Sequence, residues 1–326
     1  MIRASAIGFA MAFASLLTIG QHAVRAADYP ERSVKIIVPF PPGGAVDIIA
    51  RVLAQKLSDG LGAKFYVENL PGAGGDLGTR AAATAPADGY TLELVAPDFV
   101  ISPLVKAKVP FDPVASFAPV GLVATAQELV LVNPSVPAKD MKGLIALLKA
   151  NPGKYNFATP GYGTLPDLEG TRLFELSYGL KVVHVPFQGM APAVTATLAG
   201  QTSIIFCPAA LAAPYIKAGA LRVLATESGK RSTSFPDVPT LAEAGIPDHE
   251  SEFVSGLLAP ANTPKVVIDR LHQQIAKIMA QPDVKERLAK IGFDPLASTP
   301  GEFAAWIKAE SAIWTPVVRA ANVKID

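Results

Sequence analysis

Short apolar runs alternate with amphipathic segments along most of the chain. Residues 34–38 (VKIIV) form a mostly β-branched apolar run, which predicts a buried strand. Between Ile48 and Leu57 apolar residues recur at helical spacing, and Gly62 follows as an expected helix end. The intervening residues 39–45 (PFPPGGA) are rich in proline and glycine. The stretch therefore predicts a strand, a tight turn and a helix in succession.

The same alternation continues through the chain. Further strands are predicted at residues 64–69, 90–95, 117–124, 128–132, 155–158, 182–185, 203–206, 221–225 and 252–258. Further helices are predicted up to residue 85 and at residues 141–150, 166–178, 192–200, 208–219, 238–244, 264–280, 283–291 and 300–321. Alternating strands and helices of this length predict α/β lobes with largely parallel sheets. The 326 residues suit two lobes better than one.

The turn at residues 39–45 has features of an anion site. The first N–H groups of a helix have no partner within the helix, and they carry the positive end of its dipole. Gly43 and Gly44 allow a ligand to approach this backbone closely. In parallel α/β sheets, ligands bind at the carboxyl ends of the strands, beside such helix N-termini. On this stretch alone, an ordinary strand-to-helix connection is the alternative interpretation.

Composition and charge narrow the class of protein. The formal net charge is +1, which does not point to nucleic acid or to an anionic membrane surface as a partner. The single cysteine, Cys207, cannot form an internal disulfide.

Near the N-terminus, Arg3 precedes an apolar stretch over residues 7–19 that is short for a membrane span. We expect residues 1–26 to be a signal peptide cleaved after Ala26, with the mature protein in the periplasm; an uncleaved anchor is the alternative.

Motifs for catalysis and metal binding are missing from the sequence. The histidines show no HExxH or similar metal-ligand spacing, and there is no GxSxG elbow and no GxxxxGK[ST] phosphate loop. A nucleophilic pair of Cys207 with His184 is one interpretation, and a buried apolar cysteine is the other. The sequence therefore favours binding without turnover, and it predicts no metal and no cofactor.

Several motifs, in order along the chain, resemble those of one family. They are PFPPGGAVD at residues 39–47, NLPGAGGDLG at 69–78, PADGYTLEL at 86–94, PGYGTLPDLEG at 160–170, VPFQGMAPA at 185–193, YIKAGALRVLA at 215–225, FPDVPTLAEAG at 235–245 and GLLAPANTP at 256–264. Together they resemble the extracytoplasmic solute receptors of tripartite tricarboxylate transporters, the Bug receptor family. The resemblance covers essentially all of the expected mature chain.

This resemblance implies a fold and a partner. The fold would be α/β and two-lobed, the periplasmic-binding-protein (Venus flytrap) fold, with a mixed, mainly parallel sheet in each lobe. Residues 27–124 and 254–326 would form lobe 1, and residues 125–253 would form lobe 2. The protein would capture a small-molecule carboxylate and deliver it to the inner-membrane permease subunits of a transporter. A ligand that bridges the lobes should favour the closed state, and a monomer is the expected form.

The resemblance also implies a carboxylate clamp made of main-chain amides and waters from one loop in each lobe. The first loop carries Phe40, Pro41, Gly43, Gly44 and Ala45. The opposite loop carries Gly161, Tyr162, Gly163 and Thr164. The distal pocket would be shaped by Phe40, Phe187, Gln188, Met190 and Cys207. Tyr162 is the candidate for stacking on an aromatic ligand.

Five residues depart from the family pattern and bear on the ligand. Cys207 stands where members that bind amino acids typically have aspartate, so α-amino acids are disfavoured. Met190 adds apolar bulk to the pocket, and Asp167 replaces a common histidine just inside a helix, where its charge suits the dipole. Asp98 lies in a segment that lines the cleft, and Glu128 stands at the first crossing between lobes. Solvated rim or hinge positions would explain Asp98 and Glu128; alternatively one of them binds a hydroxyl or ring N–H of the ligand.

The sequence thus predicts a periplasmic receptor for a small organic acid. The expected ligand is a dicarboxylate or an aromatic or apolar-bodied monocarboxylate. A sensory receptor, whose ligand-bound form is recognised by a histidine kinase, is the alternative from a different class. A cysteine hydrolase built on Cys207 is a third.

Overall fold

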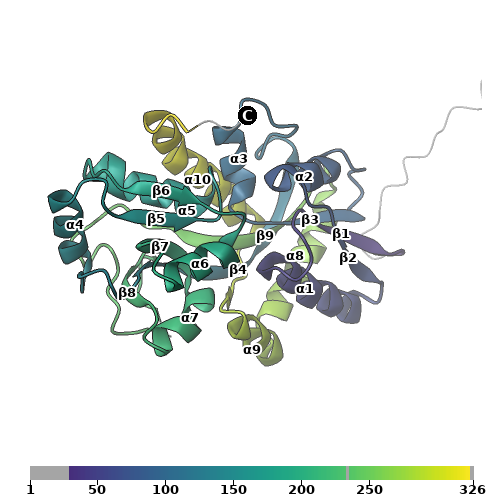
Figure 1. The fold of residues 1–326 in the computed structure, drawn as a ribbon. Coiled ribbons are helices and arrows are strands. Elements are labelled where there is room, and N and C mark those ends of the chain that lie inside the picture. Colours follow the sequence, from purple (N-terminus) through teal and green to yellow (C-terminus); the bar gives the residue numbers. More distant parts are fainter. Residues whose placement is uncertain (1–28, 233–234, 324–326) are drawn as a thin grey trace, which may run out of the picture.

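The computed structural model describes residues 29–232 and 235–323. The predicted signal peptide and its cleavage after Ala26 lie outside these residues. Figure 1 shows two halves side by side, with long strands running across the middle. Within the part of the chain that is described, no helix combines the length and the apolar character that a membrane span requires.

The elements follow the predicted alternation of strand and helix. The strands are β1 (Val34–Val38), β2 (Phe65–Asn69), β3 (Thr91–Val95), β4 (Phe117–Val132), β5 (Asn156–Thr159), β6 (Val183–Pro186), β7 (Ile204–Pro208), β8 (Arg222–Thr226), β9 (Glu252–Pro260) and β10 (Asp294–Pro295). The helices are α1 (Ala45–Leu61), α2 (Asp76–Ala83), α3 (Asp98–Val105), α4 (Met141–Ala150), α5 (Leu165–Gly170), α6 (Met190–Leu198), α7 (Ala209–Lys217), α8 (Lys265–Met279), α9 (Pro282–Lys290) and α10 (Pro300–Ala320). A 3₁₀ turn, Ala73–Gly75, precedes α2, and a π-helix, Thr171–Ser177, continues α5.

The strands form one mixed sheet in the order β2-β1-β3-β9-β4-β7-β5-β6, and β8 and β10 also pair with β4. In the first half, β1 pairs in parallel with β2 and β3. In the second half, β5 pairs in parallel with β6 and β7. Every antiparallel pair involves β4 or β9. The expected α/β fold with a mixed sheet is confirmed.

β4 is a single strand that belongs to both halves. Its residues from Phe117 to Gln127 pair with β9, and those from Glu128 to Val132 pair with β7 and β8. The predicted break between residues 124 and 128 is wrong, because Thr125 continues the ladder opposite Val254. The chain therefore passes from one half to the other between Gln127 and Glu128. The predicted lobe boundaries stay predictions.

Separate apolar clusters fill the two halves. In the first half, α1 and α8 bury residues such as Leu53 and Leu271 against the sheet. In the second half, Leu144 of α4 and Phe206 of β7 belong to a cluster of their own. A further cluster joins α3, α5 and α10 around Trp314, which is 1% exposed. The C-terminal helix thus packs against both halves, and Trp314 is part of the core.

Two predicted helices differ from the structure. Residues 238–244 form turns, because their backbone bonds to the end of β8: Thr226 N–H donates to Pro239 O, and Leu241 N–H donates to Thr226 O. The helix predicted at residues 166–178 begins one residue earlier and changes to a π-helix after Gly170.

Two predicted helix starts are displaced. α6 begins at Met190, before its proline, because Gly189 adopts φ 113° and ends the extended segment there. α7 begins at Ala209, one residue after the predicted start, and Cys207 lies within β7. Cys207 is therefore held by strand pairing, opposite Leu129 of β4.

Close packing of β9 against α10 gives a test of the fold. A Cβ at Gly256 would lie 2.3 Å from Cζ of Phe303, which is fully buried. We expect Gly256→Ala to lower the free energy of unfolding by about 1–3 kcal/mol, measured by urea denaturation with the m value unchanged. Gly301, in the first turn of α10, has open space around a Cβ. Gly301→Ala is the matched control and should be neutral or slightly stabilising; equal stability of the two variants would refute the tight contact.

A buried carboxyl in the first half makes stability depend on pH. Glu93 of β3 is fully buried and accepts a hydrogen bond from Thr79 Oγ1 at 2.6 Å. Burial raises the pKa of Glu93 to about 8 from its ordinary value of 4.5, against the smaller opposite effect of Thr79. Between these two values the folded protein holds a proton that the unfolded chain has lost, so stability falls as the pH rises through this window.

Glu93→Gln should remove this pH dependence, because glutamine keeps the acceptor for Thr79 and does not titrate. Over the range from about pH 4.5 to pH 8, the wild type should lose up to about 1.4 kcal/mol of unfolding free energy per pH unit relative to the variant. Urea denaturation at four pH values measures the two slopes. Parallel slopes would show that Glu93 is ionised in the fold.

Candidate functional site

The first candidate loop connects the carboxyl end of β1 to α1. Gly43 has φ 86°, in the left-handed region that favours glycine, and Gly44 is the extended N-cap of α1. Ala45 is the first helical residue. In the described part of the chain, no hydrogen bond uses the main-chain N–H of Gly44 or Ala45. These N–H groups are therefore free donors at the positive end of the helix dipole.

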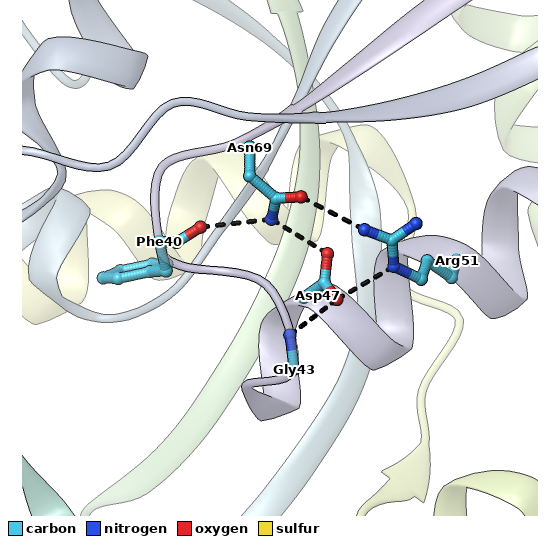
Figure 2. A network of polar contacts seen from close by, with 5 residues as sticks. All are labelled: Phe40, Gly43, Asp47, Arg51 and Asn69. Carbon is cyan, nitrogen blue, oxygen red and sulfur yellow. Dashed lines mark hydrogen bonds and ion pairs between the residues drawn. The ribbon is translucent and has the colours of Figure 1, made fainter.

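The side chain of Asp47 fixes the conformation of this loop through hydrogen bonds. Its carboxylate accepts hydrogen bonds from Gly43 N–H at 2.9 Å, Arg51 Nε at 2.9 Å and Asn69 Nδ2 at 2.8 Å. Asn69 also donates to the main-chain oxygen of Phe40 at 3.1 Å, and Figure 2 shows these groups converging on the turn. Burial tends to raise the pKa of Asp47, but the three hydrogen bonds and the Arg51 charge together lower it below 3.8. Asp47 is thus an ionised, nearly fully buried anchor of the loop.

The second candidate loop repeats this arrangement after β5. Gly163 has φ 67°, and Thr164 is the extended N-cap of α5. Asp167 lies four residues after Gly163, just as Asp47 lies four residues after Gly43. Its carboxylate accepts the N–H of Gly163 at 2.7 Å. Each half therefore presents a glycine loop that a buried aspartate locks to the helix behind it.

The second loop has its own free donors. Among the described residues, no hydrogen bond uses the main-chain N–H of Tyr162, Thr164 or Leu165. Pro166 follows at the second helical position, where it has no N–H to offer. The N–H groups of Gly43 and Gly163 themselves are taken up by the aspartates, so the residues beside them carry the donors for a ligand.

A histidine supports Asp167, as an arginine supports Asp47. His184 Nδ1 lies 3.3 Å from Asp167 Oδ1, and His184 Nε2 lies 2.6 Å from Thr159 Oγ1. The ring stacks on Phe157 and meets Tyr162 edge-on, with centroids 4.8 Å apart in both cases. Burial lowers the pKa of His184 and raises that of Asp167, and it outweighs the attraction between them. His184 is therefore neutral at pH 7.

The distal-pocket candidates gather around the second loop. The N–H groups of Phe187 and Gly189 donate to the backbone of residues 159 and 160 at 2.9 and 3.1 Å, which fixes the segment after β6 against this loop. Phe187, Met190 and Cys207 pack in one apolar cluster, and Gln188 is exposed. Tyr162 is 61% exposed, so its ring has a free face.

Cys207 does not have the surroundings of a nucleophile. The side chain is completely buried, and its thiol donates to the main-chain oxygen of Pro208 at 3.6 Å. Burial, and to a lesser degree the charge of Glu128, raises the pKa of the thiol well above its ordinary value. The thiolate is thus disfavoured, and the interpretation of Cys207 as a buried apolar residue is confirmed.

The two acidic candidates have different surroundings. Asp98, the first residue of α3, lines a small cavity together with Phe40, and burial raises its pKa to about 6. Asp98 therefore belongs with the first loop. Glu128 is 1% exposed in the interior, so a solvated rim position is wrong for this residue. The reason is that β4 passes through the middle of the sheet at this point.

The structure brings the candidates together as two groups, one in each half. The first group holds Phe40, Pro41, Gly43, Gly44, Ala45 and Asp98. The second holds Gly161, Tyr162, Gly163, Thr164, Phe187, Gln188, Met190 and Cys207. No hydrogen bond or ion pair found among the described residues joins the two groups. Nor do residues 29–232 and 235–323 contain a group of His, Cys, Asp and Glu side chains suited to hold a metal ion.

Reasoning from the sequence missed the residues whose hydrogen bonds and ion pairs support the two loops. They are Asp47, Arg51, Asn69, Thr159 and His184. A signal for the aspartates was present, because the spacing Gly-x-x-x-Asp occurs in both loops at the start of a predicted helix. Arg51 follows Asp47 at the i,i+4 spacing of one helix, whereas Asn69 and His184 come from other strands, and no spacing in the sequence links them to the aspartates.

Two α/β halves joined by a shared strand, each presenting free helix N-termini beside a glycine loop, define a solute-binding receptor. The sequence matches the tripartite tricarboxylate transporter family receptor over residues 49–323, and the chain belongs to this family. The resemblance to the Bug receptors is thereby confirmed. The family and its solved neighbours are binding proteins and not enzymes.

Three proteins show the extent of the similarity. BugT of Bordetella pertussis is 37% identical to this chain over 306 residues, which are 93% of each chain. The solved periplasmic binding protein BugD is 32% identical with a TM-score of 0.77, and the match covers 91% of this chain and 99% of BugD. The structure of Rpa4515 of R. palustris with adipate is 29% identical with a TM-score of 0.80, over 90% and 99% of the two chains. This similarity confirms the two-lobed fold.

The hydrogen bonds from Gly43 to Asp47 and from Gly163 to Asp167 can be tested one at a time. Asp47→Ala leaves the N–H of Gly43 without its acceptor, and it should lower the free energy of unfolding at pH 7 by about 1–3 kcal/mol. Because the pKa of Asp47 is lowered in the fold, the wild type should lose this advantage as the pH falls below about 4. Amide hydrogen exchange should accelerate at Gly43 and not at Gly163; Asp167→Ala, the matched variant, should do the reverse. Unchanged exchange at both glycines would show that the aspartates do not hold the loops.

Proposed function

We propose that this protein captures a small organic carboxylate in the periplasm and delivers it to the inner-membrane permease of a tripartite tricarboxylate-type transporter. The observation that carries the proposal is the repeated loop. In each half a buried aspartate uses the N–H of one glycine, Gly43 or Gly163, and leaves the neighbouring N–H groups free at a helix N-terminus. Two such loops in opposite halves suit an anion that lies between them.

The free N–H groups supply the chemistry of the clamp. Hydrogen bonds from main-chain N–H groups to a carboxylate are charge-assisted, and helix dipoles stabilise the negative charge. In the first loop the donors are Gly44 and Ala45, and in the second they are Tyr162, Thr164 and Leu165. The nearby cationic Arg51 is already paired with Asp47, so main-chain N–H groups, and not an arginine side chain, would bind the carboxylate of the ligand. Contacts from both halves would make the closed state the one that the ligand favours.

The distal residues indicate the class of carboxylate. None of the second-group residues is acidic, so this group offers no carboxylate partner for the ammonium group of an α-amino acid. The exposed ring of Tyr162 and the apolar Met190 suit a ligand with an apolar or aromatic body. Adipate, which the structure of Rpa4515 contains, is a six-carbon dicarboxylate with such a body. We therefore propose a dicarboxylate or an apolar or aromatic monocarboxylate, with Asp98 accepting a hydrogen bond from a ligand hydroxyl where one is present.

A single substitution tests the first loop. Ala45→Pro removes one free N–H at the first helical position, where proline is tolerated and the extended Gly44 accommodates it. Adipate is the first probe, followed by four- to eight-carbon dicarboxylates, hexanoate, aromatic acids and glutamate. A ligand at 100 times its Kd should raise the unfolding midpoint by a few degrees. For the ligand that binds, Ala45→Pro should weaken affinity by roughly 10- to 100-fold in calorimetry.

The control is Lys265→Pro, at the first position of α8 and remote from both loops. It should leave affinity unchanged, while both variants keep the midpoint of the free protein. Equal affinity of Ala45→Pro and wild type would exclude the first loop from the clamp. Binding confined to amino acids would overturn the proposed ligand class.

A further inference from the structure

Three glutamates meet in the interior where the chain passes between the halves. Glu128 lies in β4, Glu169 in α5, and Glu227 directly after β8; they are 1%, 2% and 2% exposed. The three carboxyl groups shift one another's pKa: Glu169 and Glu227 influence each other, and Glu128 interacts electrostatically with both. We call these three residues the glutamate cluster. None of them belongs to the two groups of candidate ligand residues.

The glutamate cluster is bonded to both segments that cross between the halves. Glu227 N–H donates to the main-chain oxygen of Glu128 at 3.0 Å, which ties β8 to β4. Ser251 N–H donates to the main-chain oxygen of Glu227 at 3.0 Å, and Ser251 Oγ donates to Glu169 Oε1 at 2.7 Å. Ser251 immediately precedes β9, which returns to the first half. A change in the charge of the cluster therefore acts on both crossings.

Among the described residues that interact with the glutamate cluster, Arg172 is the one cation. Arg172 of the π-helix lies 5.6 Å above the ring of Trp314 in α10 and donates to the main-chain oxygen of Asp248. The other titratable groups that face the cluster or Arg172 are Asp248, His249, Glu310 and Cys207. Glu310 of α10 accepts a hydrogen bond from Trp314 Nε1 at 2.7 Å. The cluster thus lies between the second half and the helix that packs against both halves.

The burial of three neighbouring carboxyls favours the protonated form of the cluster. Ionised carboxylates that are close together in the interior repel, so the proximity of these glutamates favours the retention of protons. One carboxyl oxygen of each of the three glutamates has no hydrogen-bond partner in the described structure. Burial raises the pKa of all three carboxyls, that of Glu169 to about 7. Full ionisation would place three negative charges in the interior against one arginine, which is unfavourable without water.

We propose that the glutamate cluster is a proton-operated switch that sets the orientation of the two halves. When the cluster holds its protons, the crossing stays dry and the halves keep the arrangement seen here. When protons are lost to solvent, hydration of the carboxylates displaces Ser251 and α10 and turns the halves apart. The orientation of the halves, and with it access to the space between the two loops, then depends on periplasmic pH.

Distance measurements between the halves test this proposal in the ligand-free protein, so the result does not depend on the proposed ligand. β2 and α4 lie at opposite ends of the molecule (Figure 1). Nitroxide labels are placed at Lys64→Cys, directly before β2, and at Lys142→Cys, in α4. Both sites are exposed, whereas Cys207 is fully buried and should stay unlabelled. Double electron–electron resonance at pH 5.5 and pH 8.5 should give two different distance distributions.

The triple variant Glu128→Gln, Glu169→Gln, Glu227→Gln should show one distribution at both pH values. If the triple variant does not fold, Glu169→Gln alone takes its place, because Glu169 accepts the hydrogen bond of Ser251 and interacts electrostatically with Glu128. Glu93→Gln is the matched control: it removes a buried carboxyl of the first half and should keep the wild-type shift. The proposal is overturned by identical distributions in the wild type, by a shift that survives in the cluster variant, or by its loss in Glu93→Gln.

Discussion

One sixteen-residue strand imposes the arrangement of the whole molecule. β4 pairs with β9 along its first part and with β7 and β8 along its last part, so both halves share one continuous hydrogen-bond ladder. Because backbone groups inside a sheet must be paired, neither half can separate from the other without breaking this ladder. Relative movement of the halves is thereby limited to twisting at the two crossings and to sliding of α10. The candidate loops owe their placement in opposite halves to this constraint.

Each loop then depends on an aspartate that does not face the proposed ligand. Asp47 and Asp167 use their charge on a glycine N–H, on a cation or histidine, and on the helix that follows. A turn in which glycine adopts a left-handed conformation is held by these bonds in one shape. The binding donors are therefore fixed before a ligand arrives, which reduces the ordering entropy that binding must overcome. The two locks differ in strength, since Arg51 is permanently charged and His184 is neutral at pH 7.

Buried carboxyls are the feature of this core that packing alone does not explain. Glu93 is isolated in the first half, whereas Glu128, Glu169 and Glu227 meet at the crossing. Replacing such groups with apolar residues of similar volume is often neutral or stabilising, so their presence costs stability at neutral pH. The isolated Glu93 affects only the stability of the first half. The three clustered glutamates act where both halves are joined, and this location gives their protonation a structural consequence.

Most of the strands and helices, the α/β class and the positions of both glycine loops follow from the sequence, because local hydrophobic periodicity and Pro/Gly signals are short-range. The helix α3 and the short strand β10 were not predicted. The spacing from glycine to aspartate was also legible in both loops. Tertiary structure alone decided that β4 runs unbroken through residues 125–127, because pairing with β9 overrides a weak local signal there. It also decided that residues 238–244 bond to β8 instead of coiling into a helix. The contacts of Asp47 with Asn69 and of Asp167 with His184, and the meeting of three glutamates, join residues of different elements, and only the packing of these elements brings such residues together.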